Sequence, residues 1–230
     1  MSAGGIHLNA VGVRLGDTDV LQDLSLDLDA RTVAVIGENG SGKSTFARLI
    51  GGLVNRTSGE MSILGIDPAR RAAELRRRIA IVFSNPDAQI IMPTVAEDVA
   101  FSLRADRLRA AELEERVETA MDRFGLTALA ERPSHDLSGG QKQMLALCGA
   151  FVRNPELVIA DEPTAYLDAR NARRVADHLF EDAGHRLVLV THDLSLAARC
   201  EQAVLFAGGR MVALGEPEAI IARYEAVLAC

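Results

Sequence analysis

The chain has 230 residues, of which 48% are apolar and 25% charged, and its formal net charge is −7. These proportions indicate a globular protein with one large core and exclude a disordered or fibrous chain. The acidic balance argues against a nucleic-acid partner, because such binding relies on clustered lysine and arginine. The three cysteines, Cys148, Cys200 and Cys230, are too far apart in the sequence to suggest a disulfide framework or a metal site, so we expect free thiols in a reducing compartment.

From the sequence we expect neither an export signal nor a membrane-spanning segment. Residues 1–9 lack the basic and apolar stretches of a signal peptide. The continuous apolar runs Leu157–Ala160 and Leu187–Val190 are far shorter than the roughly 20 residues that cross a bilayer. We therefore expect a chain that stays inside the cell, so that any transport role requires a separate membrane polypeptide.

Two kinds of strand pattern follow one another along the chain. Leu24, Leu26 and Leu28 alternate with polar residues, which predicts an antiparallel sheet with one wet face in the first segment. Continuous apolar runs are typical of parallel strands covered on both faces, and they occur at Thr32–Ile36, Ile79–Phe83, Leu157–Ala160 and Leu187–Val190. Gly208-Gly209 predicts a hairpin turn near the end of the chain.

Helical patterns lie between these runs. Leu113, Val117 and Met121 share one face of an amphipathic helix. A second helix is expected to begin near Ser138 and to stop before Asn154-Pro155, because proline disfavours helical geometry in the residue before it. Strands that alternate with helices predict a mostly parallel α/β core, interrupted by a helical insertion over about residues 95–137.

A glycine-rich loop follows the first buried strand, over residues 37–45, and we call it the phosphate loop. It matches G-x-x-x-x-G-K-[ST] and is expected to open a helix that runs through Leu49 and Leu53. Glycines let the backbone N–H groups face a phosphate, a lysine adds charge near the γ-phosphate, and a hydroxyl reaches Mg²⁺. The expected ATP ligands are Gly37, Asn39, Gly40, Ser41, Gly42, Lys43, Ser44 and Thr45.

Two acids, Asp161 and Glu162, end the apolar strand that begins at Leu157. The carboxyl edge of such a sheet is where α/β folds bind ligands. We expect Asp161 to hold Mg²⁺ together with Ser44, and Glu162 to accept a proton from the attacking water. By itself such an acid pair is as readily a solvated turn, but the phosphate loop favours the catalytic interpretation.

The segment Leu137-Ser138-Gly139-Gly140-Gln141 stands shortly before this acidic strand, and with it the chain resembles the ABC ATPase family over nearly its whole length. The resemblance implies an α/β fold, that of a P-loop NTPase of ABC ATPase type, with a mixed, mostly parallel core sheet, an N-terminal antiparallel β subdomain and a helical subdomain. We expect one domain over residues 1–230, with the core at about 1–94 and 138–230 and the helical subdomain at about 95–137.

The family pattern also implies roles for particular residues. Ser138, Gly139, Gly140 and Gln141 would close over the ATP held by the opposite subunit, in an ATP-dependent head-to-tail homodimer. Asp168 lies at the position of the D-loop, and His192 at the switch position, where it would contact the γ-phosphate and help Glu162 to order water. ATP is then the substrate and Mg²⁺ the cofactor.

Two positions depart from the family pattern. Ser84 stands where the family usually has a glutamine that reaches the metal, and Gln89 is a weak substitute candidate. Leu15 stands near the position of an aromatic residue that commonly stacks on adenine. An aliphatic side chain still offers dispersion, so we expect base binding that is weaker and less selective.

Residues 83–103 resemble most closely the ATPases of energy-coupling-factor importers, and within them the biotin-type module. That resemblance implies a peripheral protein on the cytoplasmic face of the membrane, partnered by an integral transport subunit and a substrate-binding membrane subunit. Ile90, Ile91 and Met92 are either a surface for a partner's helix or part of the core. Three alternatives stay open: a cobalt or nickel importer ATPase, a soluble ABC ATPase that acts on nucleic acid or the ribosome, and a regulatory module that binds ATP without hydrolysis.

Overall fold

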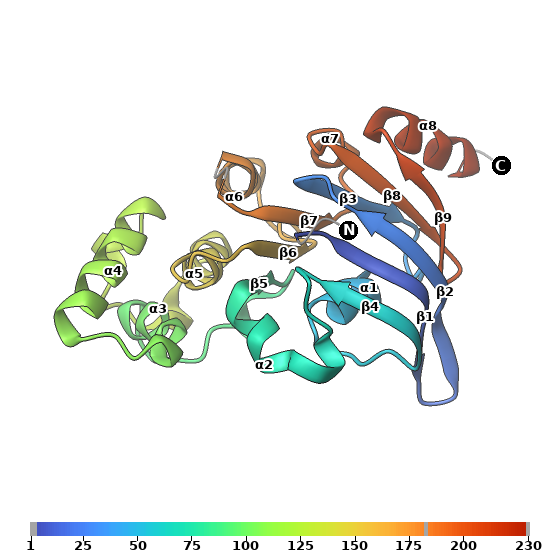
Figure 1. The fold of residues 1–230 in the computed structure, drawn as a ribbon. Helices are drawn as coiled ribbons and strands as arrows, with labels where there is room; N and C mark the ends of the chain where they lie inside the picture. Colours follow the sequence, from blue (N-terminus) through green and yellow to red (C-terminus); the bar gives the residue numbers. More distant parts are fainter. Residues whose placement is uncertain (1–3, 182–183, 229–230) are drawn as a thin grey trace. The chain divides into compact units, whose positions relative to one another are not determined.

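The computed structural model describes residues 4–181 and 184–228, and Cys230 lies outside them. The chain forms two units (Figure 1). The first unit comprises Met1–Ile79, Ile159–Asp161 and Arg186–Cys230, and the second comprises Ala80–Val158 and Glu162–His185. Cys148 and Cys200 are free and buried, and burial raises the pKa of each thiol to about 12.

The first segment of the chain forms the antiparallel sheet that the leucine alternation predicts. Its strands are β1 (Ile6–Leu15), β2 (Thr18–Leu28) and β4 (Ser58–Ile63), in the order β2-β1-β4. Leu8 pairs with Leu26 and Val11 with Leu24, and all four side chains are buried. The polar residues between the leucines of β2 face outward, so the prediction is confirmed.

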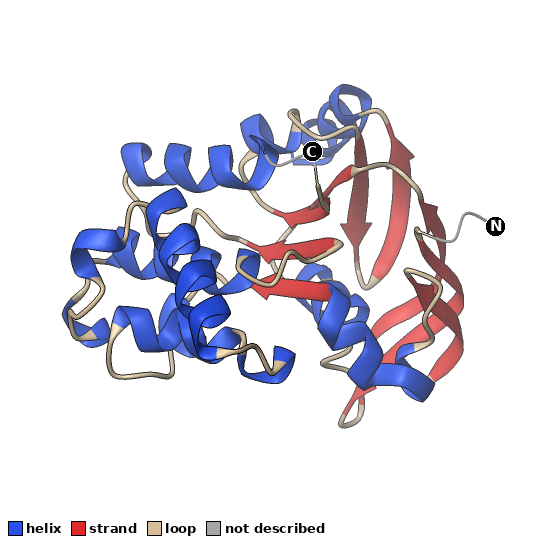
Figure 2. Cartoon of the chain, turned by 60° about the vertical axis from the view of Figure 1, so that its left-hand side comes forward, coloured by secondary structure: helices blue, strands red, loops and turns tan. Residues whose placement is uncertain are grey.

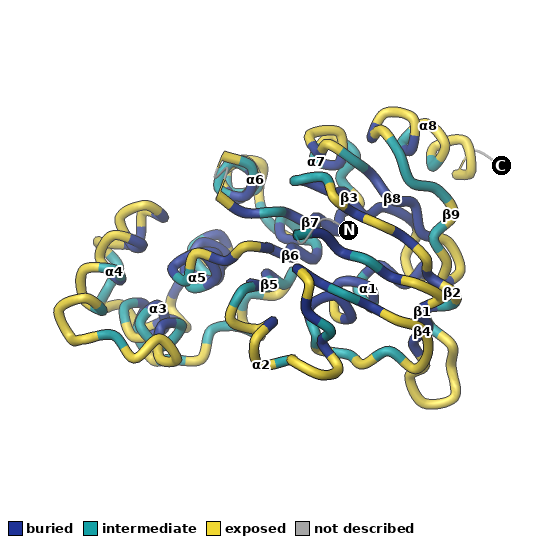
Figure 3. The backbone as a smooth tube through the Cα atoms, in the orientation of Figure 1, coloured by how far each residue is buried: buried dark blue, intermediate teal, exposed yellow. Residues whose placement is uncertain are grey.

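In the part of the chain that the structure describes, a second sheet has the strand order β5-β6-β7-β3-β8-β9. The buried apolar runs become β3 (Thr32–Gly37), β5 (Ile79–Val82), β6 (Leu157–Asp161) and β7 (Arg186–Val190). β3 runs parallel to β7 on one side and to β8 (Gln202–Ala207) on the other, and it is buried along its whole length (Figure 3). The sheet is therefore mixed, as expected, because β9 (Arg210–Gly215) returns antiparallel to β8 after the Gly208-Gly209 turn.

Among the described residues, the helices of the first unit are α1 (Lys43–Ile50), α2 (Pro68–Arg78), α7 (Leu194–Ala197) and α8 (Pro217–Leu228). Phe46 of α1 packs against Phe206 of β8, with ring centroids 5.1 Å apart. The prediction that the helix after the phosphate loop runs through Leu53 is wrong. Gly52 adopts a left-handed φ of +65°, which ends the helix, and Leu53 is 51% exposed.

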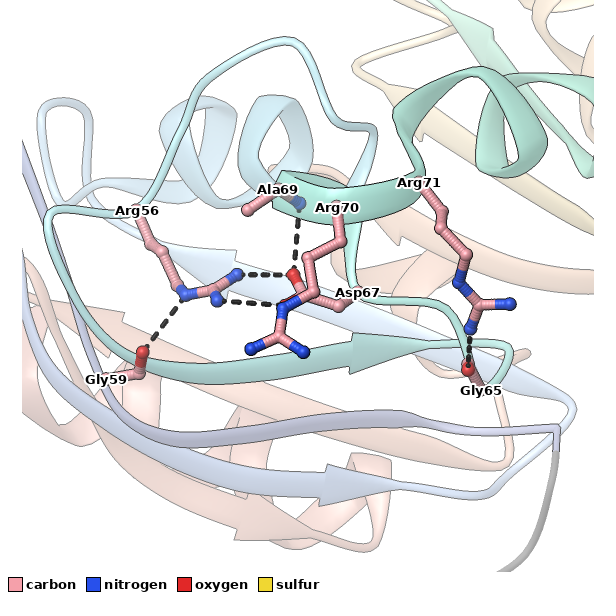
Figure 4. Close-up of polar contacts among 7 residues, drawn as sticks. All are labelled: Arg56, Gly59, Gly65, Asp67, Ala69, Arg70 and Arg71. Atoms are coloured by element: carbon pink, nitrogen blue, oxygen red, sulfur yellow. Dashed lines mark hydrogen bonds and ion pairs between the residues drawn. The ribbon is translucent and has the colours of Figure 1, made fainter.

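The start of α2 is fixed by one carboxylate (Figure 4). Asp67 accepts a hydrogen bond from the backbone N–H of Ala69 at 3.0 Å and two from the Arg56 guanidinium at 2.7 and 3.1 Å. The Arg56 hydrogen bond is the main reason that the pKa of Asp67 lies below its ordinary value. Arg56 also donates to the carbonyl of Gly59, so this cluster joins the helix cap to the start of β4.

The second unit is mainly helical (Figure 2). Its longer helices are α3 (Val95–Ser102), α4 (Ala110–Arg123), α5 (Gly139–Phe151) and α6 (Ala169–Glu181). Short 3-10 turns occur at η1 (Pro86–Ala88), η2 (Arg104–Asp106), η3 (Thr127–Leu129) and η4 (Ser134–Asp136). Val117 and Met121 bury the apolar face of α4, and α5 ends before Asn154-Pro155, as predicted.

The Gly208-Gly209 turn has a second task besides reversing the chain. The backbone N–H of Gly209 donates to the carbonyl of Ser41 in the phosphate loop, at 3.0 Å. Its carbonyl accepts from the N–H of Gln22 in β2, at 2.9 Å. Gly209 thus joins the phosphate loop to β2 and to the turn between β8 and β9.

A matched pair of substitutions tests this packing. Both turn glycines have positive φ, but a Cβ on Gly209 would lie 2.4 Å from the carbonyl oxygen of Val20, whereas one on Gly208 meets nothing within 4 Å. Gly208→Ala should cost about 1 kcal/mol of backbone strain, and Gly209→Ala about 2–4 kcal/mol because a backbone carbonyl has to move. In thermal unfolding, Gly209→Ala should melt roughly 5–10 °C lower than wild type, and Gly208→Ala about 2–4 °C lower. Equal melting temperatures for the two variants would contradict the packing.

Candidate nucleotide-binding and catalytic site

The phosphate loop follows β3 and curls back over the start of α1. Gly37 has a φ of +145°, and a Cβ there would lie 2.2 Å from the carbonyl oxygen of Phe206. Only glycine fits at this position, since both the conformation and the space exclude a side chain. Asn39 and Gly40 form the exposed tip of the loop, whereas Ser41, Gly42 and Lys43 are buried.

Lys43 holds the loop in this curled form. Its ammonium donates to the carbonyls of Gly37 and Glu38, both at 2.8 Å, and the residue is 6% exposed. Gly42 precedes α1 without a side-chain cap, so no side chain of the N-cap residue satisfies the first N–H groups of that helix. Backbone N–H groups at a helix start together with a lysine charge form an anion site suited to phosphate.

Ser44 and Asp161 meet at the first turn of α1. The Ser44 hydroxyl donates to Oδ1 of Asp161 at 3.1 Å. Burial raises the pKa of Asp161, while the Ser44 hydrogen bond and the charges of Arg48 and Lys43 oppose that rise. A hydroxyl next to a carboxylate beside a phosphate site is a donor set that fits Mg²⁺, so Ser44 and Asp161 are the residues that would hold it, and Mg²⁺ would neutralise phosphate charge there. Thr45 lies one position further along α1, half-buried.

The structure brings His192 to the same edge of the sheet as the phosphate loop. Val190 of β7 pairs with Val35 of the parallel strand β3, and the N–H of Thr191 donates to the carbonyl of Val35 at 3.2 Å. Gly37 therefore ends β3 and His192 follows the end of the adjacent strand β7, where it is exposed. Parallel strands place such residues together at the ligand-binding edge.

Glu162 directly follows Asp161 and has a left-handed φ of +52°. This conformation is uncommon for a residue with a side chain, and such strain concentrates at functional positions. Glu162 belongs to the second unit, and so do the signature residues Ser138, Gly139, Gly140 and Gln141.

The signature residues begin α5 with a capping box. The Ser138 hydroxyl accepts from the N–H of Gln141 at 3.4 Å, and Oε1 of Gln141 accepts from the N–H of Ser138 at 2.9 Å. A Cβ on Gly139 would meet nothing within 4 Å, so the helix start is open at that point. Ser138 and Gly139 thus present a second helix N-terminus to solvent.

The sequence did not indicate Asn171, which lies between two of the predicted motifs. A Cβ on Gly140 would lie 2.5 Å from the side-chain amide carbon of Asn171, so this glycine makes room for that residue. The backbone N–H and the side-chain amide of Asn171 both donate to Asp168 at 2.8 Å, and the backbone hydrogen bond is the main reason that the pKa of Asp168 is lowered. Asn171 therefore joins the D-loop position to the start of α5. Next to it Tyr166 is 98% exposed.

The two departures occupy distinct environments. Ser84 is half-buried after β5. The side chain of Gln89 is hydrogen-bonded to nearby backbone: its Oε1 accepts from the N–H of Phe83 and its Nε2 donates to the carbonyl of Ile81, both at 2.8 Å. Leu15 ends β1 and is 45% exposed, which leaves an apolar contact surface there.

The segment Ile90–Met92 lies at the surface of the second unit. Ile91 is 67% exposed, and its two neighbours are partly exposed. The buried carboxylate of Asp98 accepts from the N–H groups of Ile91 and Met92 at 2.7 and 2.9 Å. Of the two interpretations of this segment, the exposure of Ile91 favours a contact surface.

Comparison with known proteins agrees with this arrangement. The family model described as ABC transporter matches residues 21–165. The biotin transport ATP-binding protein BioM of Rhizobium etli is 40% identical over 97% of the chain and 99% of its own length. An energy-coupling factor transporter ATP-binding protein, EcfA1 of Latilactobacillus sakei, is 40% identical over 88% of the chain and 74% of its own length.

Two solved structures share the fold. The structure of cbiO1 from Clostridium perfringens, part of the ABC transporter complex cbiONQ, has a TM-score of 0.84 at 30% identity and covers 97% of the chain and 93% of its own. A dimeric, post-hydrolysis state of the ATP-binding cassette MJ0796 with ADP and Pi has a TM-score of 0.81 at 27% identity, covering 92% and 98%.

Asp161→Asn separates two effects of the buried carboxylate, namely its destabilisation of the fold and its role in binding MgATP. The pKa of Asp161 is raised in the folded chain, so its ionisation destabilises the fold as the pH rises through that pKa. The nucleotide-free variant should therefore melt above wild type at pH 7, with the difference vanishing near the ordinary aspartate pKa of about 4. Its affinity for MgATP should fall about tenfold or more, whereas that for ATP in EDTA should not change. A variant that melts lower at pH 7 and keeps its MgATP affinity would contradict both roles.

Proposed function

The chain belongs to the ABC transporter family, as one of its ATPases, and on that premise we propose that it drives an energy-coupling-factor importer by hydrolysing ATP in a head-to-tail homodimer. One observation carries the proposal: the chain has a helix N-terminus at Lys43, which no side chain caps by a hydrogen bond, and a second, open one at Gly139 after Ser138. Each is suited to an anion.

The dimer follows from the need to use both helix starts on one nucleotide. In a two-fold arrangement, the phosphate loop of one copy faces the Ser138 helix start of the other, and two ATP molecules are enclosed. The dimeric structure of MJ0796, which holds ADP and Pi, supports this interpretation. The fully exposed side chain of Tyr166, beside Asp168, is then a further candidate for the surface between copies.

The catalytic roles follow from the chemistry of the side chains. Glu162 acts as the general base that takes a proton from the attacking water, while His192 contacts the γ-phosphate and orients that water. Lys43 and the backbone of the phosphate loop stabilise the charge on the transferred phosphoryl group, and Ser44 and Asp161 hold Mg²⁺. Leu15 offers an apolar contact to the base.

The importer type rests on the names of the relatives and on the loop after β5. BioM is named for biotin transport and EcfA1 for an energy-coupling factor transporter, so biotin is the cargo that we favour, and cobalt or nickel import is the alternative. Ile91, presented by Asp98, gives an integral membrane transport subunit an apolar contact on this peripheral protein, and a membrane substrate-binding subunit completes the complex.

In the described residues no helix is long and apolar enough to span a bilayer.

A different class of function, a soluble ABC ATPase that acts on nucleic acid or the ribosome, shares the nucleotide-binding residues. Purification of the complex from its native membrane discriminates the two. Membrane subunits and a bound vitamin or metal support the importer, whereas ribosomal or nucleic-acid partners support the alternative.

Glu162→Gln should separate binding from hydrolysis. The amide keeps the shape of the side chain but cannot accept a proton, so steady phosphate release should fall about 100-fold or more while ATP binding persists. With MgATP the variant should run as a dimer in size-exclusion chromatography, and without nucleotide as a monomer. Glu118→Gln, an exposed substitution on α4, serves as the matched control and should leave both properties unchanged. If Glu162→Gln hydrolyses ATP at the wild-type rate, or stays monomeric at saturating MgATP, the proposed mechanism is wrong.

A further inference from the structure

The loop between β5 and α3 is stiffened from inside. The side-chain amide of Gln89 ties the end of the loop to its beginning. Its Oε1 accepts a hydrogen bond from the N–H of Phe83, and its Nε2 donates to the carbonyl of Ile81. Asn85 caps η1 by accepting from the N–H of Asp87 at 3.0 Å. A segment with these internal bonds moves as one piece rather than bending residue by residue.

Two polar contacts fasten this loop to α5. The Lys142 ammonium lies 2.7 Å from Oδ1 of Asp87, and Nε2 of Gln143 donates to the carbonyl of Phe83 at 3.3 Å. Both α5 residues belong to the first two turns of the helix that Ser138 caps, and the N–H of Lys142 donates to the carbonyl of Ser138 at 2.8 Å. The loop is therefore attached to the first two turns of the helix whose start carries the signature residues.

The surroundings of the ion pair allow a displacement of the loop to reach the start of α5. The side chain of Lys142 is 18% exposed and that of Asp87 is 62% exposed, so the lysine stem is held by packing while the carboxylate lies on the outer side. Beyond this point α5 is packed into the interior, because residues 143–148 are all buried. A displacement of the loop then moves the start of α5 as a body instead of being absorbed along the helix.

The outer end of the same loop leads into the exposed Ile91. Its backbone is held by Asp98, and the carbonyl of Met92 accepts from the hydroxyl of Ser134 at 2.9 Å. A partner that presses on Ile91 thus acts on a segment with fixed geometry, which continues through Gln89 and Asp87 to Lys142. All these residues belong to the second unit.

We propose that Asp87 and Lys142 are positioning residues. Their ion pair couples the loop between β5 and α3, which carries Ile91, to the orientation of the helix start at Ser138. This inference rests on the proposed function, because it assigns to the pair the transfer of the partner's position to the ATP site of the opposite copy. Neither residue touches ATP in this account. Their loss should therefore affect the response to the membrane subunits and not hydrolysis by the chain alone.

The test compares the isolated chain with the complex purified from membranes through a tag on this chain. Asp87→Asn and Lys142→Gln should each keep the ATPase rate of the isolated chain within about twofold, and each should lose about fivefold or more of the extra rate that the membrane subunits confer. The reversed pair, Asp87→Lys with Lys142→Glu, should recover at least about half of that extra rate, because the attraction is restored with its signs exchanged. Glu112→Gln is the matched control: it removes a 3.0 Å ion pair with Arg109 at the start of α4, and it should leave the stimulation unchanged.

Rescue by the reversed pair is the readout that mere structural damage cannot give. If both single variants keep full stimulation in a complex in which wild type is stimulated, or if the reversed pair is as impaired as the single variants, the inference is wrong while the proposed function stands. If wild type hydrolyses ATP but neither binds nor responds to a membrane subunit, the proposed function and this inference fall together.

Discussion

The interaction on which the proposed function depends is that between phosphate and the backbone N–H groups at the start of a helix. The chain carries a net charge of −7, so a nucleotide triphosphate finds little attraction in its overall field. Favourable charge is instead local: the helix start after Gly42, the buried Lys43 and the open start of α5. The phosphate loop depends on glycine, since a side chain at Gly37 would overlap the carbonyl of Phe206.

These local sites are held by the fold rather than by the loop alone. The phosphate loop is bonded to the β8–β9 turn through Gly209, and that turn is bonded in turn to β2. The antiparallel sheet therefore helps to fix the loop that we propose to bind phosphate. In the second unit the capping box of Ser138 and Gln141 fixes the other helix start, and Asn171 joins it to Asp168. Rigid support of this kind keeps electrostatic donors oriented before the substrate arrives.

Most of the fold and the local motifs could be predicted from the sequence, because periodicity and glycine spacing are local signals. The leucines of β2, the buried strand before Gly37 and the cap at Ser138 lie where the pattern placed them. The helix after the phosphate loop was predicted too long, since Leu53 continues the apolar spacing while Gly52 adopts a left-handed conformation. Asn171 and the Asp87–Lys142 pair could not be predicted, because such contacts join distant segments and leave no periodic trace. The departure at Ser84 was visible in the sequence, but only the structure shows that Gln89 is bonded to its own loop.

The central claim is that each ATP is shared by two copies of the chain, and mixing two disabled variants tests it most directly. Lys43→Ala removes the phosphate-loop charge, Ser138→Arg blocks the other helix start, and each variant alone should be inactive. In a mixed dimer one site receives both defects and the other receives none, so random pairing should restore up to about a quarter of the wild-type rate of phosphate release. A mixture that never exceeds the activity of either variant alone would contradict the shared site.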